Sequence, residues 1–133
     1  MINMEELKGI IDDLGIDALE TNLKIAGVAV VSDSGNLVIQ SNNWDLTNET
    51  NTVLNVIKGD ILSKVSFNLS GADFNIVEKT PEGIIGTNNS GMGHVIFATF
   101  QGGVLVAYAM PRADPLKALS FLKPYAMRLN GKI

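Results

Sequence analysis

The feature that most constrains the fold is a pair of apolar segments joined by three residues. Val95–Phe100 and Val104–Met110 are rich in β-branched and aromatic side chains, which favour strands. The linker between them, Gln101-Gly102-Gly103, contains glycines that can supply the positive φ angles of a short hairpin turn. The sequence therefore predicts an antiparallel β-hairpin here, around which the other elements must pack.

A helix is predicted shortly after this hairpin. Asp114 is a suitable N-cap, and Pro115 suits the first helical position, where its missing N–H has no partner to lose. Apolar residues then recur at helical spacing, at Leu116, Leu119, Leu122, Tyr125, Ala126 and Leu129. Because a proline inside a helix removes one hydrogen bond, we expect the helix to bend or begin afresh at Pro124.

Composition limits both the size of the fold and its partners. The chain has 133 residues, 46% of them hydrophobic, which fits a single domain spanning residues 1–133. Its net charge is −4 and its basic residues are scattered, which argues against nucleic acid as the main partner. There is no cysteine, no basic and apolar leader, and no apolar run near the roughly 20 residues of a membrane span. We expect a cytoplasmic protein that is not embedded in a membrane.

The first third of the chain predicts a helix and two strands. Asn3 can cap an amphipathic helix with Glu6 as its capping-box partner, and Gly15 is a point at which this helix can break. Ile25–Val31 is a buried strand, and turn residues then lead into a second strand at Leu37–Ser41. The two strands are therefore expected to pair antiparallel.

The middle of the chain predicts a short helix and further strands. The helix begins at a Thr47 or Asn48 cap and ends near Gly59, and Leu62 and Val65 suggest one more helical turn. A third strand is opened by Phe67–Gly71 and continues through Asp73–Glu78. A type I turn at Thr80-Pro81-Glu82-Gly83 precedes a fourth strand at Ile84–Thr87, and the Asn88–Gly93 loop leads into the principal hairpin. The predicted class is α+β, with a central antiparallel sheet of about six strands whose faces are both covered by helices.

The residues give little support for catalysis. His94 is the single histidine, and it has no second histidine or cysteine with which to bind a metal. The glycine-rich segment Gly86–Gly93 lacks the Lys-Ser/Thr pair and the helix start of a phosphate-binding loop. We therefore predict that the protein is not an enzyme and needs no cofactor or metal.

Three segments resemble the profilin family. Gly27–Ser41, GVAVVSDSGNLVIQS, resembles the first profilin hairpin, and Phe67–Gly86, FNLSGADFNIVEKTPEGIIG, is similar to a later strand, turn and strand that close on Ile-x-Gly. Val95–Leu129 matches the C-terminal block, with Val104-Leu105 in its second strand, Pro115 at the helix start and Leu129 late in the helix. Together the segments cover about two-thirds of the chain in the family's order. The resemblance implies a profilin-like fold, with the N- and C-terminal helices on one face of the sheet and the short helical segment on the other.

Profilins bind monomeric actin, proline-rich segments and phosphoinositides, so the resemblance implies a regulator of actin or actin-like filament assembly that associates with the cytoskeleton. Carried over by position, the actin-facing residues are Ser63, Lys64, Asp73, Asn75, Glu78, Phe97, Thr99, Asp114, Leu116, Lys117, Leu119 and Ser120. Asp73 and Glu78 replace residues that are commonly basic or neutral in the family, which redraws the charge match to actin. These departures suggest a divergent member, of the kind that would serve an archaeal actin-like filament.

The other two profilin ligands have less support in the sequence, and we expect proline-rich segments to bind weakly or not at all. The polyproline positions correspond to Val38, Tyr125 and Arg128, where profilins present aromatic rings that stack on proline. Only Tyr125 supplies such a ring. For phosphoinositides, the basic residues near the C-terminus form only a dilute strip in an acidic protein.

A second hypothesis is the roadblock fold, a small dimeric scaffold that regulates small GTPases. The first predicted strand pair fits this fold equally well, but a roadblock protein has a long central helix followed by three strands. A roadblock protein should elute as a dimer, whereas a profilin should elute as a monomer.

Overall fold

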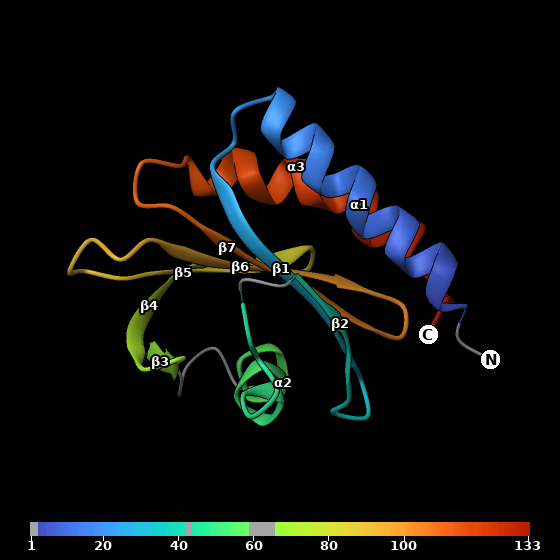
Figure 1. Cartoon of the computed structure of the whole chain (residues 1–133). Helices are drawn as coiled ribbons and strands as arrows, with labels where there is room; N and C mark the ends of the chain where they lie inside the picture. Colours follow the sequence, from blue (N-terminus) through green and yellow to red (C-terminus); the bar gives the residue numbers. More distant parts are fainter. Residues whose placement is uncertain (1–2, 42–43, 59–65) are drawn as a thin grey trace.

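The computed structural model describes residues 3–41, 44–58 and 66–133. Across these residues the elements are α1 (Met4–Glu20), β1 (Ile25–Ser32), β2 (Leu37–Gln40), α2 (Thr50–Lys58), β3 (Ser66–Leu69), β4 (Ala72–Thr80), β5 (Gly83–Thr87), β6 (His94–Phe100), β7 (Gly103–Ala109) and α3 (Pro115–Arg128) (Figure 1). The strands form one antiparallel sheet in the order β2-β1-β7-β6-β5-β4-β3. The predicted α+β class is therefore confirmed.

The hairpin predicted from the sequence lies at the centre of this sheet. β6 pairs with β7 from His94 opposite Ala109 to Phe100 opposite Gly103. Gly102 has a φ of +115°, a conformation that favours glycine because it has no Cβ. Every other strand is placed by pairing outwards from this hairpin, with β1 on one side and β5 on the other.

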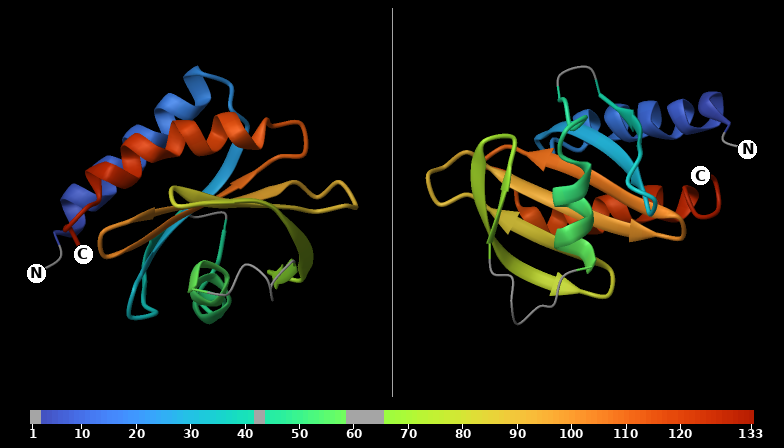
Figure 2. Two further views of the ribbon diagram at one scale, coloured as in Figure 1. Left: turned by 180° about the vertical axis from the view of Figure 1, so that it is seen from behind. Right: turned by 90° about the horizontal axis from the view of Figure 1, so that it is seen from below.

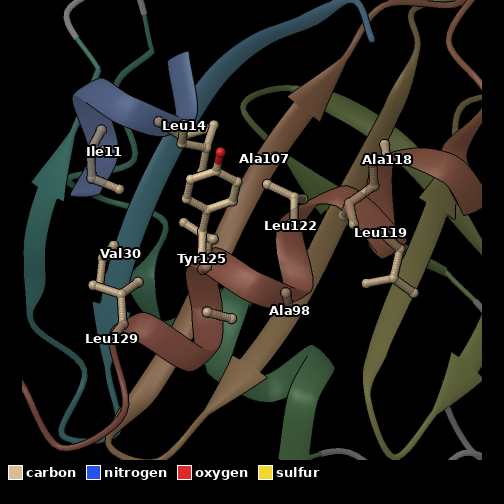
Figure 3. Close-up of a cluster of buried hydrophobic side chains, with 14 of the residues drawn as sticks. Ile11, Leu14, Val30, Ala98, Ala107, Ala118, Leu119, Leu122, Tyr125 and Leu129 are labelled. Carbon is tan, nitrogen blue, oxygen red and sulfur yellow. The ribbon is translucent and has the colours of Figure 1, made fainter. Parts of the chain in front are cut away.

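Helices cover both faces of the sheet, as predicted. α1 and α3 lie together on one face, and α2 lies on the opposite face (Figures 1 and 2). On the α1/α3 face, Leu14, Ile96 and Leu122 belong to one buried cluster, and Figure 3 shows Leu122 and Tyr125 directed from α3 into it. On the α2 face, Val53 and Phe97 belong to a second buried cluster. Burial of these two apolar layers is the main force that holds the helices to the sheet.

The structure refines the prediction for the first helix. Asn3 caps α1 as expected, and its side chain accepts a hydrogen bond from the Glu6 backbone N–H at 3.1 Å. α1 nevertheless continues without a break through Gly15, which lies on its exposed side. Glycine costs about 1 kcal/mol in a helix, and burial of neighbours such as Leu14 on the same helix offsets this cost.

The third predicted strand is two strands. Phe67–Gly71 and Asp73–Glu78 were expected to form one element, but β3 and β4 pair antiparallel, with Leu69 opposite Ala72. Ser70 and Gly71 join them with φ angles of +53° and +83°, the signs that a two-residue hairpin turn of type I′ requires. The sheet therefore has seven strands among the described residues, slightly more than the expected six.

The elements from α2 onwards distinguish the profilin fold from the roadblock fold. The nine-residue α2 is followed by five strands in the described part of the chain, whereas the roadblock fold expects a long central helix and three. The helical turn suggested at Leu62 and Val65 lies outside the described residues. α3 runs through the exposed Pro124 as one helix, so the second helix start considered there is not seen.

Candidate protein-binding surface

The beginning of α3 presents an apolar side chain from a firmly capped helix end. The Asp114 carboxylate accepts hydrogen bonds from the backbone N–H groups of Leu116 at 3.0 Å and Lys117 at 3.3 Å. These bonds satisfy donors that have no partner within the helix. Leu116 is 56% exposed, and Lys117 and Ser120 are also exposed. The cap thus holds an exposed leucine among polar neighbours at a fixed position.

Polar side chains of β4 point to the same side of the sheet as α3. Asn75 pairs with Thr87 and Glu78 with Ile85, and Ile85 belongs to the cluster beneath α3. Alternation along a regular strand would place residues 75 and 78 on opposite faces. A bulge between Ile76 and Glu78 shifts the register by one residue, so both face the α3 side.

Two contacts fix α3 against this part of the sheet. Leu119 is only 7% exposed and packs against Gly83, where an added Cβ would lie 2.6 Å from its Cδ1 atom. Lys123 of α3 forms an ion pair with Glu82 in the turn between β4 and β5. α3 is therefore fixed over β5, the strand next to β4. We group the predicted site residues of α3 and β4 as the α3–β4 surface and define it as Asp73, Asn75, Glu78, Asp114, Leu116, Lys117 and Ser120.

Not every residue predicted to face actin lies on this surface. Leu119 lies beneath it, as part of the core. Phe97 is fully buried on the opposite face, where its ring meets the edge of Phe67 at a centroid distance of 5.5 Å. Thr99 pairs with Val104, whose side chain also belongs to the α2 face. Ser63 and Lys64 lie outside the described residues.

The structure adds one residue that sequence reasoning did not select. Val77 is 57% exposed at the β4 bulge, beside Glu78. A valine in a strand is usually buried, and nothing in the local sequence marks the bulge that turns this one outwards. Leu116 is the apolar member of the α3–β4 surface, and Val77 is a second exposed apolar side chain, on β4.

Charge on the α3–β4 surface is mostly negative. Asp73 and Glu78 face outwards on β4, although the Asp73 carboxylate also accepts a hydrogen bond from the Asn68 amide at 3.0 Å. Lys117 is the basic member of the set as defined above. A partner with basic side chains opposite β4 would therefore be matched electrostatically.

The three polyproline positions are arranged quite differently. Tyr125 is buried between α3 and α1, and its hydroxyl donates a hydrogen bond to the Asp17 carboxylate. Arg128 lies 5.7 Å from the centre of the Tyr125 ring and forms a 3.0 Å ion pair with Asp13. Val38 is half-buried against the same cluster. These side chains are thus engaged within the protein.

Burial also changes the chemistry of the tyrosine. Loss of solvent around the phenol, followed by its hydrogen bond to Asp17, raises the pKa of Tyr125 to about 12. Ionisation would place a phenolate beside a carboxylate. The hydroxyl therefore remains a donor to Asp17 throughout the physiological pH range.

The described residues offer no catalytic arrangement around the single histidine. His94 is buried, with its Nδ1 atom 2.9 Å from the Thr87 hydroxyl and its Nε2 atom 3.3 Å from the Pro111 carbonyl oxygen. Within residues 3–41, 44–58 and 66–133, no three His, Asp or Glu side chains form a group that could hold a metal. Over the same ranges, no helix has both the length and the apolar character needed to cross a membrane.

Comparison with known proteins gives close relatives over nearly the full length. No family model matches the sequence. The chain is 32% identical to Loki profilin-1 of Lokiarchaeum sp. (strain GC14_75), an alignment that covers 97% of this chain and 98% of the relative. The structure matches LokiProfilin1 solved in complex with rabbit actin with a TM-score of 0.87, 31% identity and full coverage of both chains. It matches LokiProfilin2 in its rabbit actin complex with a TM-score of 0.85 and 32% identity, over 97% of this chain and 98% of the other.

Proposed function

Because this chain belongs to the profilin family, we propose that it binds actin monomers and thereby regulates the assembly of actin or actin-like filaments. Profilins are not enzymes, and the protein accordingly acts by binding. The proposed location is the cytoplasm, in association with the cytoskeleton.

One observation carries this proposal. The relative that matches over the full length, with a TM-score of 0.87, is a profilin whose structure was solved with rabbit actin bound. The second such complex, at 32% identity, supports the same partner. A chain that shares this backbone presents a similarly shaped surface to an actin subunit.

The α3–β4 surface is the proposed contact region. Leu116 can serve as its apolar anchor, because it is exposed on a capped helix end whose position is fixed. The polar residues of β4 lie beyond it across β5. Leu119 is buried beneath α3 and Phe97 is buried on the opposite face of the sheet, so neither is proposed to touch the partner.

Proline-rich segments are proposed to bind weakly or not at all. A polyproline helix is recognised by exposed aromatic faces and nearby hydrogen-bond donors. Here the Tyr125 ring is buried, its hydroxyl is bonded to Asp17, and Arg128 is paired with Asp13. Binding would require these intramolecular contacts to break first.

Phosphoinositide binding is proposed to be weak for an electrostatic reason. Of the four basic residues near the C-terminus, Lys123, Arg128 and Lys132 form ion pairs with Glu82, Asp13 and Glu6. Each pair reduces the positive potential that an anionic headgroup would meet.

An assembly assay with pyrene-labelled rabbit actin tests the proposed function. Monomer binding lowers the concentration of free subunits, so added protein should slow spontaneous assembly in proportion to its concentration. Assembly curves that remain unchanged at a several-fold molar excess would contradict the proposal. On a sizing column the free protein is expected to elute as a monomer.

A further inference from the structure

A pocket on the α2 side of the sheet carries an inference independent of actin binding. It has a volume of about 260 Å³. It is lined by Ala26, Gly27, Trp44, Leu69, Ser70, Ala72, Phe74, Met92, Val95 and Tyr108, and we call it the Trp44 pocket. No residue of α2 lines it, and Figure 2 shows that α2 crosses only part of this face. The sheet curls at β4 (Figure 1), and the β3–β4 hairpin supplies Leu69, Ser70, Ala72 and Phe74 to the wall of the pocket.

The walls of the pocket are held in place by packing and hydrogen bonds. Trp44 lies directly on Gly27, where an added Cβ would come within 2.9 Å of the Trp44 Cβ atom. The Tyr108 hydroxyl donates a hydrogen bond to the Met92 carbonyl oxygen, and the Ser70 backbone N–H donates to Glu49 at 3.0 Å. The pocket is therefore largely formed before any ligand enters, which is typical of small-molecule sites.

The lining selects for an uncharged aromatic ligand. None of the lining residues that the structure describes carries a charge, so a charged ligand would lose its hydration without gaining a partner among them. The ring centroids of Trp44 and Tyr108 lie 6.2 Å apart and the ring planes are tilted by 42°. Phe74 lines the same pocket. Such rings favour the edge or face of another ring.

Size narrows the class of ligand further. An engineered apolar cavity of about 150 Å³ binds benzene, so a pocket of about 260 Å³ holds one or two fused rings. It leaves little room for a polypeptide backbone as well. We propose that the Trp44 pocket binds a small, neutral, planar aromatic molecule of the size of indole.

An NMR titration with indole tests this proposal on the intact protein. Trp44 is the single tryptophan, so its indole N–H gives one cross-peak that reports directly on the pocket. The proposal predicts a saturable shift of this peak and of the Gly27 and Tyr108 amides. Indole-3-acetate and tryptamine should bind at least tenfold more weakly, because each carries a charge. N-acetyl-tryptophanamide should also bind at least tenfold more weakly, because it carries backbone atoms.

Two variants and one control keep the test specific. Ala72→Leu fills the pocket and Met92→Glu places a carboxylate at its exposed rim, so each should weaken indole binding at least tenfold. Met127→Glu places the same charge at an exposed methionine on α3, outside the pocket, and should leave binding unchanged. Since Met92 and Met127 are exposed, these two variants are expected to fold even if Ala72→Leu does not.

Three results would overturn the proposal. The first is no saturable shift at millimolar indole, and the second is shifts that persist in the Met92→Glu variant. The third is equal or tighter binding of a charged analogue or of N-acetyl-tryptophanamide, which would assign the pocket to another class of ligand.

Discussion

The hydroxyl of Tyr125 in α3 donates a hydrogen bond to the carboxylate of Asp17 in α1, across 108 positions of sequence. This bond joins the two helices that cover one face of the sheet. It also removes the one aromatic side chain at the polyproline positions from any external ligand. The contact is therefore both a structural tie and a determinant of what the surface can bind.

Tyr125→Phe should make the free energy of unfolding less sensitive to pH in the alkaline range. The pKa of Tyr125 is raised to about 12 in the folded protein, above its ordinary value of 10.0. The neutral phenol is thus favoured by folding, and its contribution is complete below pH 10 and is lost as the pH rises through 12. Removing the hydroxyl should cost about 1 kcal/mol near pH 8. Urea unfolding of both proteins should show this difference shrinking between pH 10 and 12, and a constant difference would contradict the assignment.

Leu116→Glu should weaken actin binding at least tenfold without unfolding the protein. The side chain is 56% exposed at the proposed contact, so its replacement removes an apolar anchor while leaving the core intact. Met127→Glu is a matched control, because Met127 is 65% exposed at the far end of the same helix. Binding can be measured by calorimetry with rabbit actin monomers. Equal losses in both variants would argue for a general charge effect. Leu119 is unsuitable for this test because it is buried.

Gly83→Ala should destabilise the fold by roughly 1–3 kcal/mol. An added Cβ would lie 2.6 Å from Leu119 Cδ1 and would also collide with the Phe97 carbonyl oxygen. Gly9→Ala is the matched control, since Gly9 is exposed on α1 and has no atom within 4 Å of an added Cβ. That change should stabilise the protein by about 0.5–1 kcal/mol because alanine is the better helix former. Chemical denaturation of the two variants should give opposite signs.

Asp114→Ala should cost about 1 kcal/mol of stability, because it removes the hydrogen bonds to the Leu116 and Lys117 N–H groups. Asp114→Asn retains an oxygen acceptor at the cap and should recover most of this loss. If the cap also positions Leu116 for actin, the alanine variant should bind more weakly and the asparagine variant nearly normally. Thermal unfolding and calorimetric binding on the same samples separate the two effects.

A proline decamer should leave the Tyr125 resonances of the protein unchanged at millimolar concentration. The ring is buried and its hydroxyl is bonded to Asp17, so no flat aromatic face is offered to the peptide. Tight, saturable shifts would show that the helices open readily.

Local chemistry made much of the fold predictable from the sequence. Asn3 and Asp114 are N-caps whose hydrogen-bond partners lie two or three residues further along the chain, and Gly102 lies in a tight turn between two consecutive strands. The turn at Ser70 was missed because a serine with positive φ is uncommon. Contacts over long range carried no local signal, and the Tyr125–Asp17 bond is the clearest case.

The candidate surface was predictable only in part. The positions on α3 follow from the profilin resemblance, and the helix that holds them is predicted by its cap and its apolar repeat. The face on which the β4 residues lie depends on a bulge beside Val77 that no residue type indicates. Phe97 illustrates the converse limit. The sequence correctly predicts that Phe97 lies in a strand. Its side chain is buried on the α2 face against Phe67, which is a contact with a distant strand that has no local signal in the sequence.

Sedimentation velocity of the fluorescently labelled protein with unlabelled rabbit actin monomers measures complex formation directly. We expect a single faster species of one-to-one stoichiometry for the wild type and for Met127→Glu, and a marked loss of this species for Leu116→Glu. Sedimentation of the wild-type protein alone at every actin concentration would contradict the proposed function. A wild-type complex that Leu116→Glu forms equally well would contradict the proposed surface.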